Sequence, residues 1–165
     1  MKYKYVQVNN KNKYSIKKSL LKDLINNYNE KDLYYNKYGK PYIKDVFFNI
    51  SHSFGYMIVA TSDSEIGVDI EKVRDVRDEL IDFIATKKER EYIYEDIQNK
   101  EKRAFEIYTL KEAYFKMLGI GLQDFKSVGF IINDCSTICS DKNVNASLHY
   151  DIDGYVFAIC EKVSQ

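Results

Sequence analysis

The change of hydrophobic period at Gly119 is the feature that most constrains how this chain can fold. Residues 101–118 carry apolar side chains at helical spacing, and a glycine directly after them is typical of a helix end. Beyond Gly119, residues 127–132, 145–152 and 155–161 have the alternating, β-branched and aromatic composition of strands. A long helix followed by strands predicts an α+β fold.

Four segments of the first half also have the composition of strands: residues 3–8, 46–50, 56–61 and 65–71. Short polar turns separate the last three, so we expect them to be neighbours in one central sheet. Near the end of the chain, Asp153-Gly154 is a strong signal for a two-residue hairpin turn.

Three further helices are expected. The first begins after Ser15 as N-cap, with an apolar face that extends to Tyr28, and the others cover residues 76–85 and 87–97, the latter with Thr86 as its cap. Between the first helix and the sheet, Tyr38-Gly39-Lys40-Pro41 predicts a turn that holds Lys40 on a constrained loop.

The chain contains 25 basic and 25 acidic residues, so its formal net charge is zero. This balance argues against nucleic-acid binding, which uses a basic face. The charges are unevenly placed, since residues 1–44 contain 11 Lys and three acidic residues, whereas residues 45–165 contain 14 basic and 22 acidic ones. Two interpretations stay open: a surface that holds a polyanion, and a solvated lysine-rich face.

No apolar run approaches the ~20 residues of a membrane span, and the N-terminus has no apolar core of a signal peptide. We therefore expect no membrane partner and a cytoplasmic location. Cys135, Cys139 and Cys160 contain no Cys-x-x-Cys pair, which favours reduced thiols over a zinc site. Any bound metal is expected to have oxygen ligands.

Two carboxylates on one expected strand suggest such a metal site. Asp69 and Glu71 are two residues apart, so both point to the same face, and a divalent hard cation such as Mg²⁺ relieves their repulsion. The alternative is an exposed edge strand in which polar and apolar residues simply alternate. On the helix of residues 101–118, Glu112 and Lys116 also share a face, a spacing that by itself indicates only a surface ion pair.

These residues belong to four motifs that follow one another along the chain. The motifs are Tyr38-Gly39-Lys40-Pro41, Phe48 to Ser53, Gly67 to Glu71, and Thr109 through Lys116 to Gly121-Leu122. With these motifs, the chain resembles the 4′-phosphopantetheinyl transferases of the larger, Sfp-like class and would be a short variant of it. The resemblance extends from about Lys17 to Cys160. The smaller holo-acyl-carrier-protein synthase class lacks an Asn-Ile-Ser-His-Ser segment upstream of the acidic motif.

The resemblance implies one compact domain over residues 1–165, built of two similar α/β lobes at about 1–62 and 63–165, the first reduced. A monomer is expected rather than an oligomer. The implied reaction is Mg²⁺-dependent transfer of the phosphopantetheine arm of coenzyme A to a serine of an apo acyl or peptidyl carrier protein, with release of adenosine 3′,5′-bisphosphate. Mn²⁺ is an alternative metal.

The resemblance also assigns roles to the catalytic residues. Asp69, Glu71 and Glu112 are the expected metal ligands, and Glu112 or Glu71 is the expected base for the incoming serine. Lys116 is expected to contact the phosphates and assist the leaving group, and His52 is a further catalytic candidate. Lys111 matches the motif and receives no chemical step.

Coenzyme A is expected to contact Lys18, Lys40, Ser51, His52 and Lys116. Two departures from the family pattern matter here. Tyr108 stands where the family usually has Trp, and the shorter N-terminal region leaves the grip on the 3′-phosphate to Lys18 or to the alternatives Lys11, Lys13 and Lys17. These departures keep a non-catalytic coenzyme A or carrier-binding module open as the second hypothesis.

Overall fold

The computed structural model describes residues 1–121, 123–133 and 136–163. Leu122 and Cys135, which the sequence analysis named, lie outside these residues. The strands are β1 (Lys2–Gln7), β2 (Tyr34–Tyr35), β3 (Pro41–Tyr42), β4 (Phe47–Ser53), β5 (Tyr56–Ser62), β6 (Ile66–Lys72), β7 (Phe130–Asn133), β8 (Ser136–Cys139), β9 (Val144–His149) and β10 (Tyr155–Lys162). The helices are α1 (Lys13–Leu24), α2 (Asp78–Ile84), α3 (Lys87–Glu95) and α4 (Lys100–Leu118), with short 3₁₀ turns at Glu30–Asp32, Ile97–Asn99 and Phe125–Ser127.

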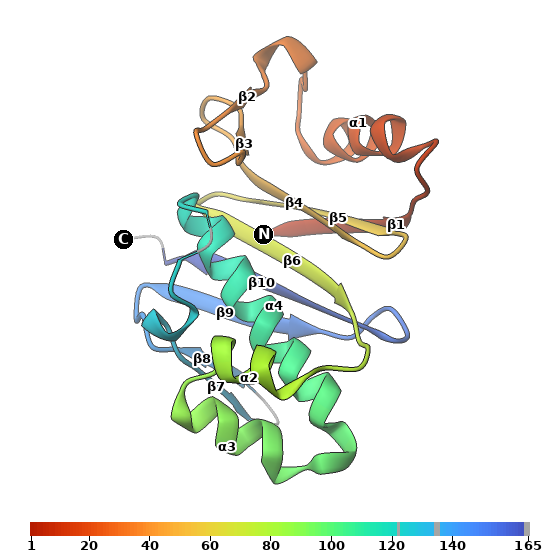
Figure 1. The fold of residues 1–165 in the computed structure, drawn as a ribbon. Helices are drawn as coiled ribbons and strands as arrows, with labels where there is room; N and C mark the ends of the chain where they lie inside the picture. The colour runs from red at the N-terminus through yellow and green to blue at the C-terminus, as the bar shows by residue number, and fades with distance from the viewer. Residues whose placement is uncertain (122, 134–135, 164–165) are drawn as a thin grey trace.

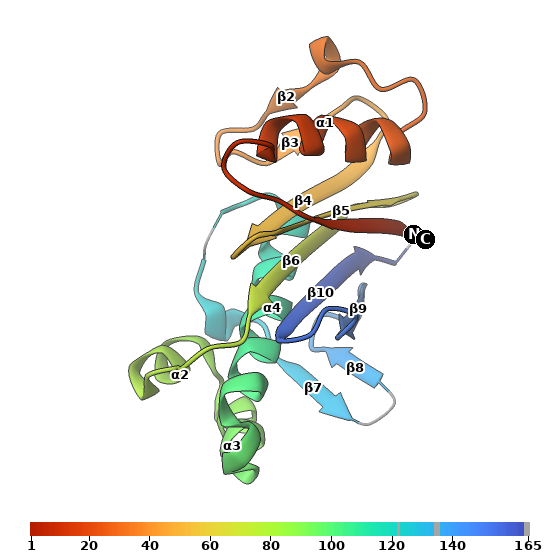
Figure 2. The ribbon, with the colours of Figure 1, turned by 90° about the vertical axis from the view of Figure 1, so that its right-hand side faces the viewer.

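These elements form layers, as Figures 1 and 2 show. Helix α1 packs on a three-stranded sheet of order β1-β5-β4, and α4 packs on a five-stranded sheet of order β6-β10-β9-β8-β7. A third cluster of buried side chains, which includes Ile58, Val68 and Phe157, joins β5 to β6 and β10. The chain therefore has the expected α+β architecture, with β6 and α4 at its centre.

The predicted central sheet is wrong in one respect. β5 pairs with β4 on one side and with β1 on the other, but β6 pairs with β10 in the other sheet. β6 still lies beside β4, because two β4 side chains replace the missing strand ladder. Asn49 Oδ1 accepts a hydrogen bond from the Val68 N–H at 3.0 Å, and Ser51 Oγ accepts one from the Ile70 N–H at 3.4 Å.

Helix ends follow the local sequence in two places and depart from it in one. Thr86 and Glu89 form the capping box of α3, and Gly119 ends α4 in left-handed geometry with φ 67°. Ser15 is not the N-cap of α1, which begins at Lys13 after Asn12. Its hydroxyl instead donates to the Asn12 carbonyl from within the first turn, a local bond that competes with capping.

The predicted two-residue hairpin is also wrong. β9 ends at His149, so residues 150–154 connect it to β10, with Gly154 in left-handed geometry at φ 73°. Ile152 turns back into the core at 7% exposure, which explains why the longer connection is stable. β8 and the small β2–β3 hairpin were not predicted.

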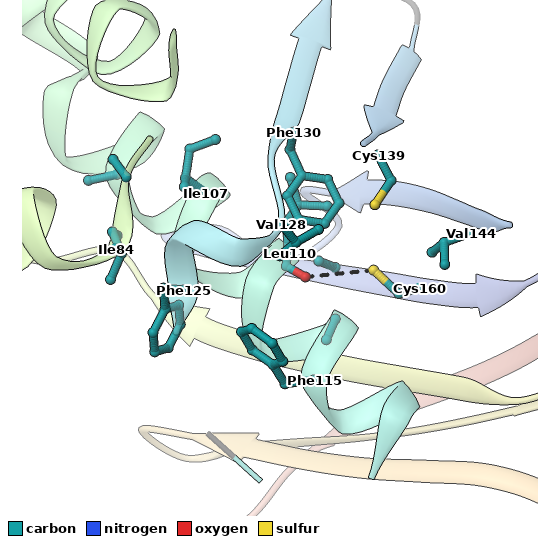
Figure 3. Packing of buried hydrophobic residues seen from close by; sticks show 14 of the residues in the cluster. Ile84, Ile107, Leu110, Phe115, Phe125, Val128, Phe130, Cys139, Val144 and Cys160 are labelled. Atoms are coloured by element: carbon teal, nitrogen blue, oxygen red, sulfur yellow. Dashed lines mark hydrogen bonds between the residues drawn. The ribbon is translucent and has the colours of Figure 1, made fainter. Parts of the chain in front are cut away.

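One apolar core joins α4 to the five-stranded sheet (Figure 3). Cys139 and Cys160 are buried in it as free thiols, and the Cys160 Sγ donates to the Leu110 carbonyl at 3.6 Å. Burial raises the pKa of both thiols. In the described residues, no helix is both long and apolar enough to span a membrane.

Candidate functional site

β6 and α4 lie unusually close together because Gly67 has no side chain. A Cβ at this position would lie 2.0 Å from the Ala113 carbonyl oxygen and 2.3 Å from the Met117 nitrogen. Alternate residues of a strand share a face, so Asp69 and Glu71 emerge on the same side of β6 as Gly67. The close approach therefore brings the two strand carboxylates to the polar face of α4.

Asp69 is the buried centre of this contact, at 3% exposure. Its Oδ1 accepts hydrogen bonds from Ser51 Oγ at 2.8 Å and from Lys116 Nζ at 2.5 Å, and the same ammonium lies 3.0 Å from Ser51 Oγ. Its Oδ2 is buried without a hydrogen-bond partner among the described residues. Burial raises the pKa of the Asp69 carboxyl. The positive charge of Lys116 lowers it, but by less than burial raises it.

Glu112 lies one helical turn before Lys116 on α4. Burial raises the pKa of its carboxyl, and the negative charge of Asp69 raises it further, whereas Lys116 and the Tyr108 hydroxyl act in the opposite direction. The Tyr108 ring stacks on Phe125 at 5.8 Å between ring centres, so an aromatic residue packs where the family pattern has Trp.

Glu71 is held by two groups for which no role was predicted from the sequence. Ser53 Oγ and Arg74 Nη1 donate to its Oε2 at 2.9 and 3.0 Å. The Arg74 guanidinium lies over the rings of Phe54 and Phe105, at 5.0 and 4.6 Å from their centres. Ser53 could have been found from the sequence, because it shares a face of β4 with Ser51.

A pocket of about 290 Å³ opens beside this cluster. Glu112 and Lys116 of α4 line one side, Asn49 and Ile50 of β4 line another, and the 38–41 segment closes it. The charged residues Lys40, Glu112 and Lys116 are part of the lining, which suits a charged or phosphorylated ligand.

Comparison with known proteins identifies the family to which the chain with these site residues belongs. A family model described as the 4′-phosphopantetheinyl transferase superfamily matches residues 65–160, which include β6, α4 and all three acidic candidates. The chain belongs to the 4′-phosphopantetheinyl transferase superfamily.

Individual relatives agree with this membership. The 4′-phosphopantetheinyl transferase Sfp of Bacillus subtilis (strain 168) is 31% identical over 145 residues, which are 75% of this chain and 60% of that protein. The transferase gsp of Aneurinibacillus migulanus is 34% identical over 89 residues, which are 53% of this chain and 38% of that protein. The chain thus spans less than two thirds of the length of either relative.

Among solved structures, the holo-[acyl-carrier-protein] synthase of Thermotoga maritima has a similar fold. The TM-score is 0.53 at 22% sequence identity, over 62% of this chain and 64% of that one. At this identity the likeness concerns the fold alone.

A divalent cation fits the residues around Asp69, although no ligand cluster is preformed. Among the described side chains, no three His, Cys, Asp or Glu residues converge as a metal site. The bare, buried Asp69 Oδ2 nevertheless lacks a positive partner, and the charge of Asp69 acts on Glu112. Carboxylate oxygens are the donors that Mg²⁺ prefers. Asp69 and Glu112 are thus suited to hold the cation, and Glu71 to join them if its Arg74 contact opens.

The predicted coenzyme A residues divide between two places. Ser51 and Lys116 meet at Asp69, whereas His52 is exposed on the opposite face of β4, as expected for the next residue of a strand. The His52 Nε2 is hydrogen bonded to Lys13 Nζ of α1. Lys18 forms an ion pair with Glu30 at 2.7 Å. Lys13, an alternative to Lys18 in the sequence analysis, is therefore the lysine that contacts His52.

Lys40 is directed at the protein itself. Its Nζ donates to the Met117 carbonyl at 2.7 Å, at the C-terminal end of α4, and pairs with Glu65 at 3.2 Å. Lys40 is also one of the residues that line the pocket. Contact between its ammonium and coenzyme A stays a prediction.

Lys111 has a structural place. It is completely buried, and its Nζ donates to the Ile84 and Phe125 carbonyls and pairs with Glu89, each at 2.7 Å. Glu89 also accepts hydrogen bonds from the N–H groups of Thr86 and Phe130, so the buried pair is well satisfied and ties α2, α3 and β7 to α4.

Proposed function

We propose that the protein transfers the 4′-phosphopantetheine arm of coenzyme A to a serine hydroxyl of an apo acyl or peptidyl carrier protein. The products are the holo carrier and adenosine 3′,5′-bisphosphate. The observation that carries the proposal is Asp69, whose buried Oδ2 has no hydrogen-bond partner among the described residues and whose Oδ1 contacts Lys116. The charge of Asp69 acts on Glu112, and Glu112 and Lys116 both line the pocket. All three residues lie in the region that the family model matches.

The reaction is a displacement at phosphorus. The serine oxygen forms a bond to the phosphorus that carries the pantetheine arm, and the pyrophosphate bridge to the adenosine bisphosphate breaks. The serine proton goes to Glu112, whose raised pKa makes it a stronger base than an exposed glutamate, with Glu71 as the alternative acceptor. The electron pair of the broken bond leaves on the bisphosphate oxygen.

Positive charge must meet the charge that develops on that oxygen. Lys116 supplies it from α4, where its side chain is 31% exposed, and in the reaction it would move from Asp69 to a phosphate. A bound Mg²⁺ would orient the pyrophosphate and act as a Lewis acid. Asp69 and Glu112 would hold it there, and Ser51 keeps Asp69 in place.

The test is an incubation with coenzyme A, Mg²⁺ and an apo carrier protein, followed by intact-mass measurement of the carrier. We expect a gain of one phosphopantetheine arm. Asp69→Asn and Glu112→Gln should lower the rate at least about 100-fold, in the range of lost general base or electrostatic stabilisation. Glu91→Gln, at an exposed glutamate on α3, is the matched control and should react normally.

The second candidate is a coenzyme A or carrier-binding module without catalysis. It is favoured by the absence of a preformed ligand cluster among the described side chains. Mg²⁺-dependent coenzyme A binding in a calorimeter, with no mass gain on a panel of apo carriers, would establish it in place of the transferase.

A further inference from the structure

The turn between β2 and β3 reaches across the molecule to the end of α4. This turn, residues 36–40, belongs to a two-stranded sheet that shares no strand with the larger sheets. Figure 1 shows it above the last turn of α4. Hydrogen bonds to the end of α4 help to fix the position of this turn.

Asn36 joins the turn to the helix with a single side chain. Its Oδ1 accepts hydrogen bonds from the Tyr38 and Lys40 N–H groups, at 2.9 and 3.0 Å, which shapes the turn. Its Nδ2 donates to the Gly119 carbonyl at 2.8 Å, 83 positions further along the chain. All hydrogen-bonding capacity of this side chain except one N–H is thereby used.

Lys40 neutralises the same helix end. The last carbonyls of a helix lack intrahelical partners and carry partial negative charge. Lys40 Nζ donates to one of them, that of Met117, at 2.7 Å, and its side chain is only 14% exposed. A cation so placed stabilises the final turn, which carries Lys116.

Gly119 and Gly121 leave room for this contact. A Cβ at Gly119 would lie 3.0 Å from Lys40 Cδ and 3.2 Å from Asn36 Nδ2, and one at Gly121 would lie 3.1 Å from the Tyr38 ring. The turn and α4 are therefore packed at contact distance, and together they line the pocket that contains Glu112 and Lys116.

We infer that Asn36 and Lys40 are positioning residues that hold the last turn of α4, and with it Lys116, in the geometry that the transfer requires. This inference rests on the proposed function. It gives Lys40 a role through Lys116 rather than through its own contact with coenzyme A.

The experiment compares Asn36→Ala and Lys40→Met in the transfer assay with saturation curves for coenzyme A. We expect kcat to fall at least tenfold in both variants, with KM for coenzyme A within twofold of the wild type. Lys40→Arg should restore most of kcat, because a guanidinium can still donate to the Met117 carbonyl. Lys44→Met, an exposed lysine after β3 that forms no ion pair in the described structure, is the control and should behave as the wild type.

The inference is overturned if kcat is unchanged in both variants, or if Lys40→Met raises KM alone while Asn36→Ala is normal, since that pattern belongs to a phosphate-binding lysine. If the wild type shows no transfer, the proposed function fails, and amide hydrogen exchange at residues 116–119 decides the inference. Faster exchange in Asn36→Ala than in Lys44→Met supports the contact, and equal exchange refutes it.

Discussion

At Asp69 the protein keeps a negative charge that its own side chains balance only in part. Lys116 and Ser51 both approach Oδ1, and Oδ2 is left bare among the described residues. Since an ammonium and a divalent cation compete for one carboxylate, Lys116 is the counter-ion that a bound metal would partly displace.

Lys116→Met should therefore strengthen divalent-cation binding by about tenfold, which corresponds to ~1.4 kcal/mol. The measurement is a Mn²⁺ titration by calorimetry in the absence of coenzyme A, so that it does not depend on turnover. Lys102→Met, at an exposed lysine earlier on α4, is the control. Weaker binding in Lys116→Met than in this control would show that the lysine assists the metal.

Glu112→Gln should stabilise the metal-free protein at neutral pH although it removes the expected base. The folded pKa of Glu112 is raised above its ordinary value of 4.5, so the carboxyl favours folding below that pH and loses this contribution as pH rises through the folded pKa. A glutamine does not ionise, so the variant keeps its stability as the pH rises. Each ~1 kcal/mol gained raises Tm by about 2–4 °C in a chain of this size.

Thermal unfolding at several pH values in a chelator checks this prediction. The difference in Tm between Glu112→Gln and wild type should grow between about pH 4.5 and neutrality and vanish below. A lower Tm for the variant at pH 7 would mean that the ionised carboxylate is stabilised in the metal-free fold.

The sequence predicted residues well where their roles depend on near neighbours. The shared face of Asp69 and Glu71 followed from strand alternation, and the same rule places Ser51 and His52 on opposite faces, although the sequence analysis grouped them. The contacts that Lys111 and Lys40 make could not be predicted, because their partners are 14 to 77 positions away. A sequence motif does not distinguish a buried lysine from an exposed one.

Helices and strands were also predicted correctly where they depend on short-range signals, and incorrectly where they depend on distant pairing. The Thr86 cap and the Gly119 stop are short-range features, and both are confirmed. Membership of β6 in the second sheet depends on pairing with β10, almost 90 positions away, so the sequence order β4-β5-β6 suggested a sheet that does not form.

The contact between β6 and α4 gives the clearest prediction at this scale. Gly67→Ala should destabilise the fold by ~3 kcal/mol or more, at the upper end for overpacked cores, because the clashing atoms belong to the α4 backbone. Urea unfolding measures the change. Gly129→Ala is the matched control, since a Cβ there meets no atom within 4 Å. Equal midpoints in the two variants would mean that α4 can shift freely.

At the scale of the whole molecule, the two sheets are joined by side chains in place of a strand ladder. Asn49, at 3% exposure, accepts from the Val68 N–H, and Ser51 bonds both to the Ile70 N–H and to Asp69. The seam between the sheets and the candidate site are therefore built from the same β4 side chains.

Asn49→Ala should cost ~1–3 kcal/mol, the range for a buried donor left without its acceptor. Chemical denaturation followed by circular dichroism measures this loss, and Asn145→Ala, at an exposed position of β9, is the control. If Asn49→Ala unfolds at the same denaturant concentration as the control, the Val68 N–H has another acceptor and the seam is held by apolar packing alone.

The side-chain seam also makes Val68 and Ile70 natural reporters of opening. Most strand amides are protected by a ladder that breaks only when the sheet unfolds, whereas these two depend on the rotamers of Asn49 and Ser51. Deuterium uptake at these two positions, measured with the rest of β6 as an internal reference, would register separation of the sheets while each remains folded.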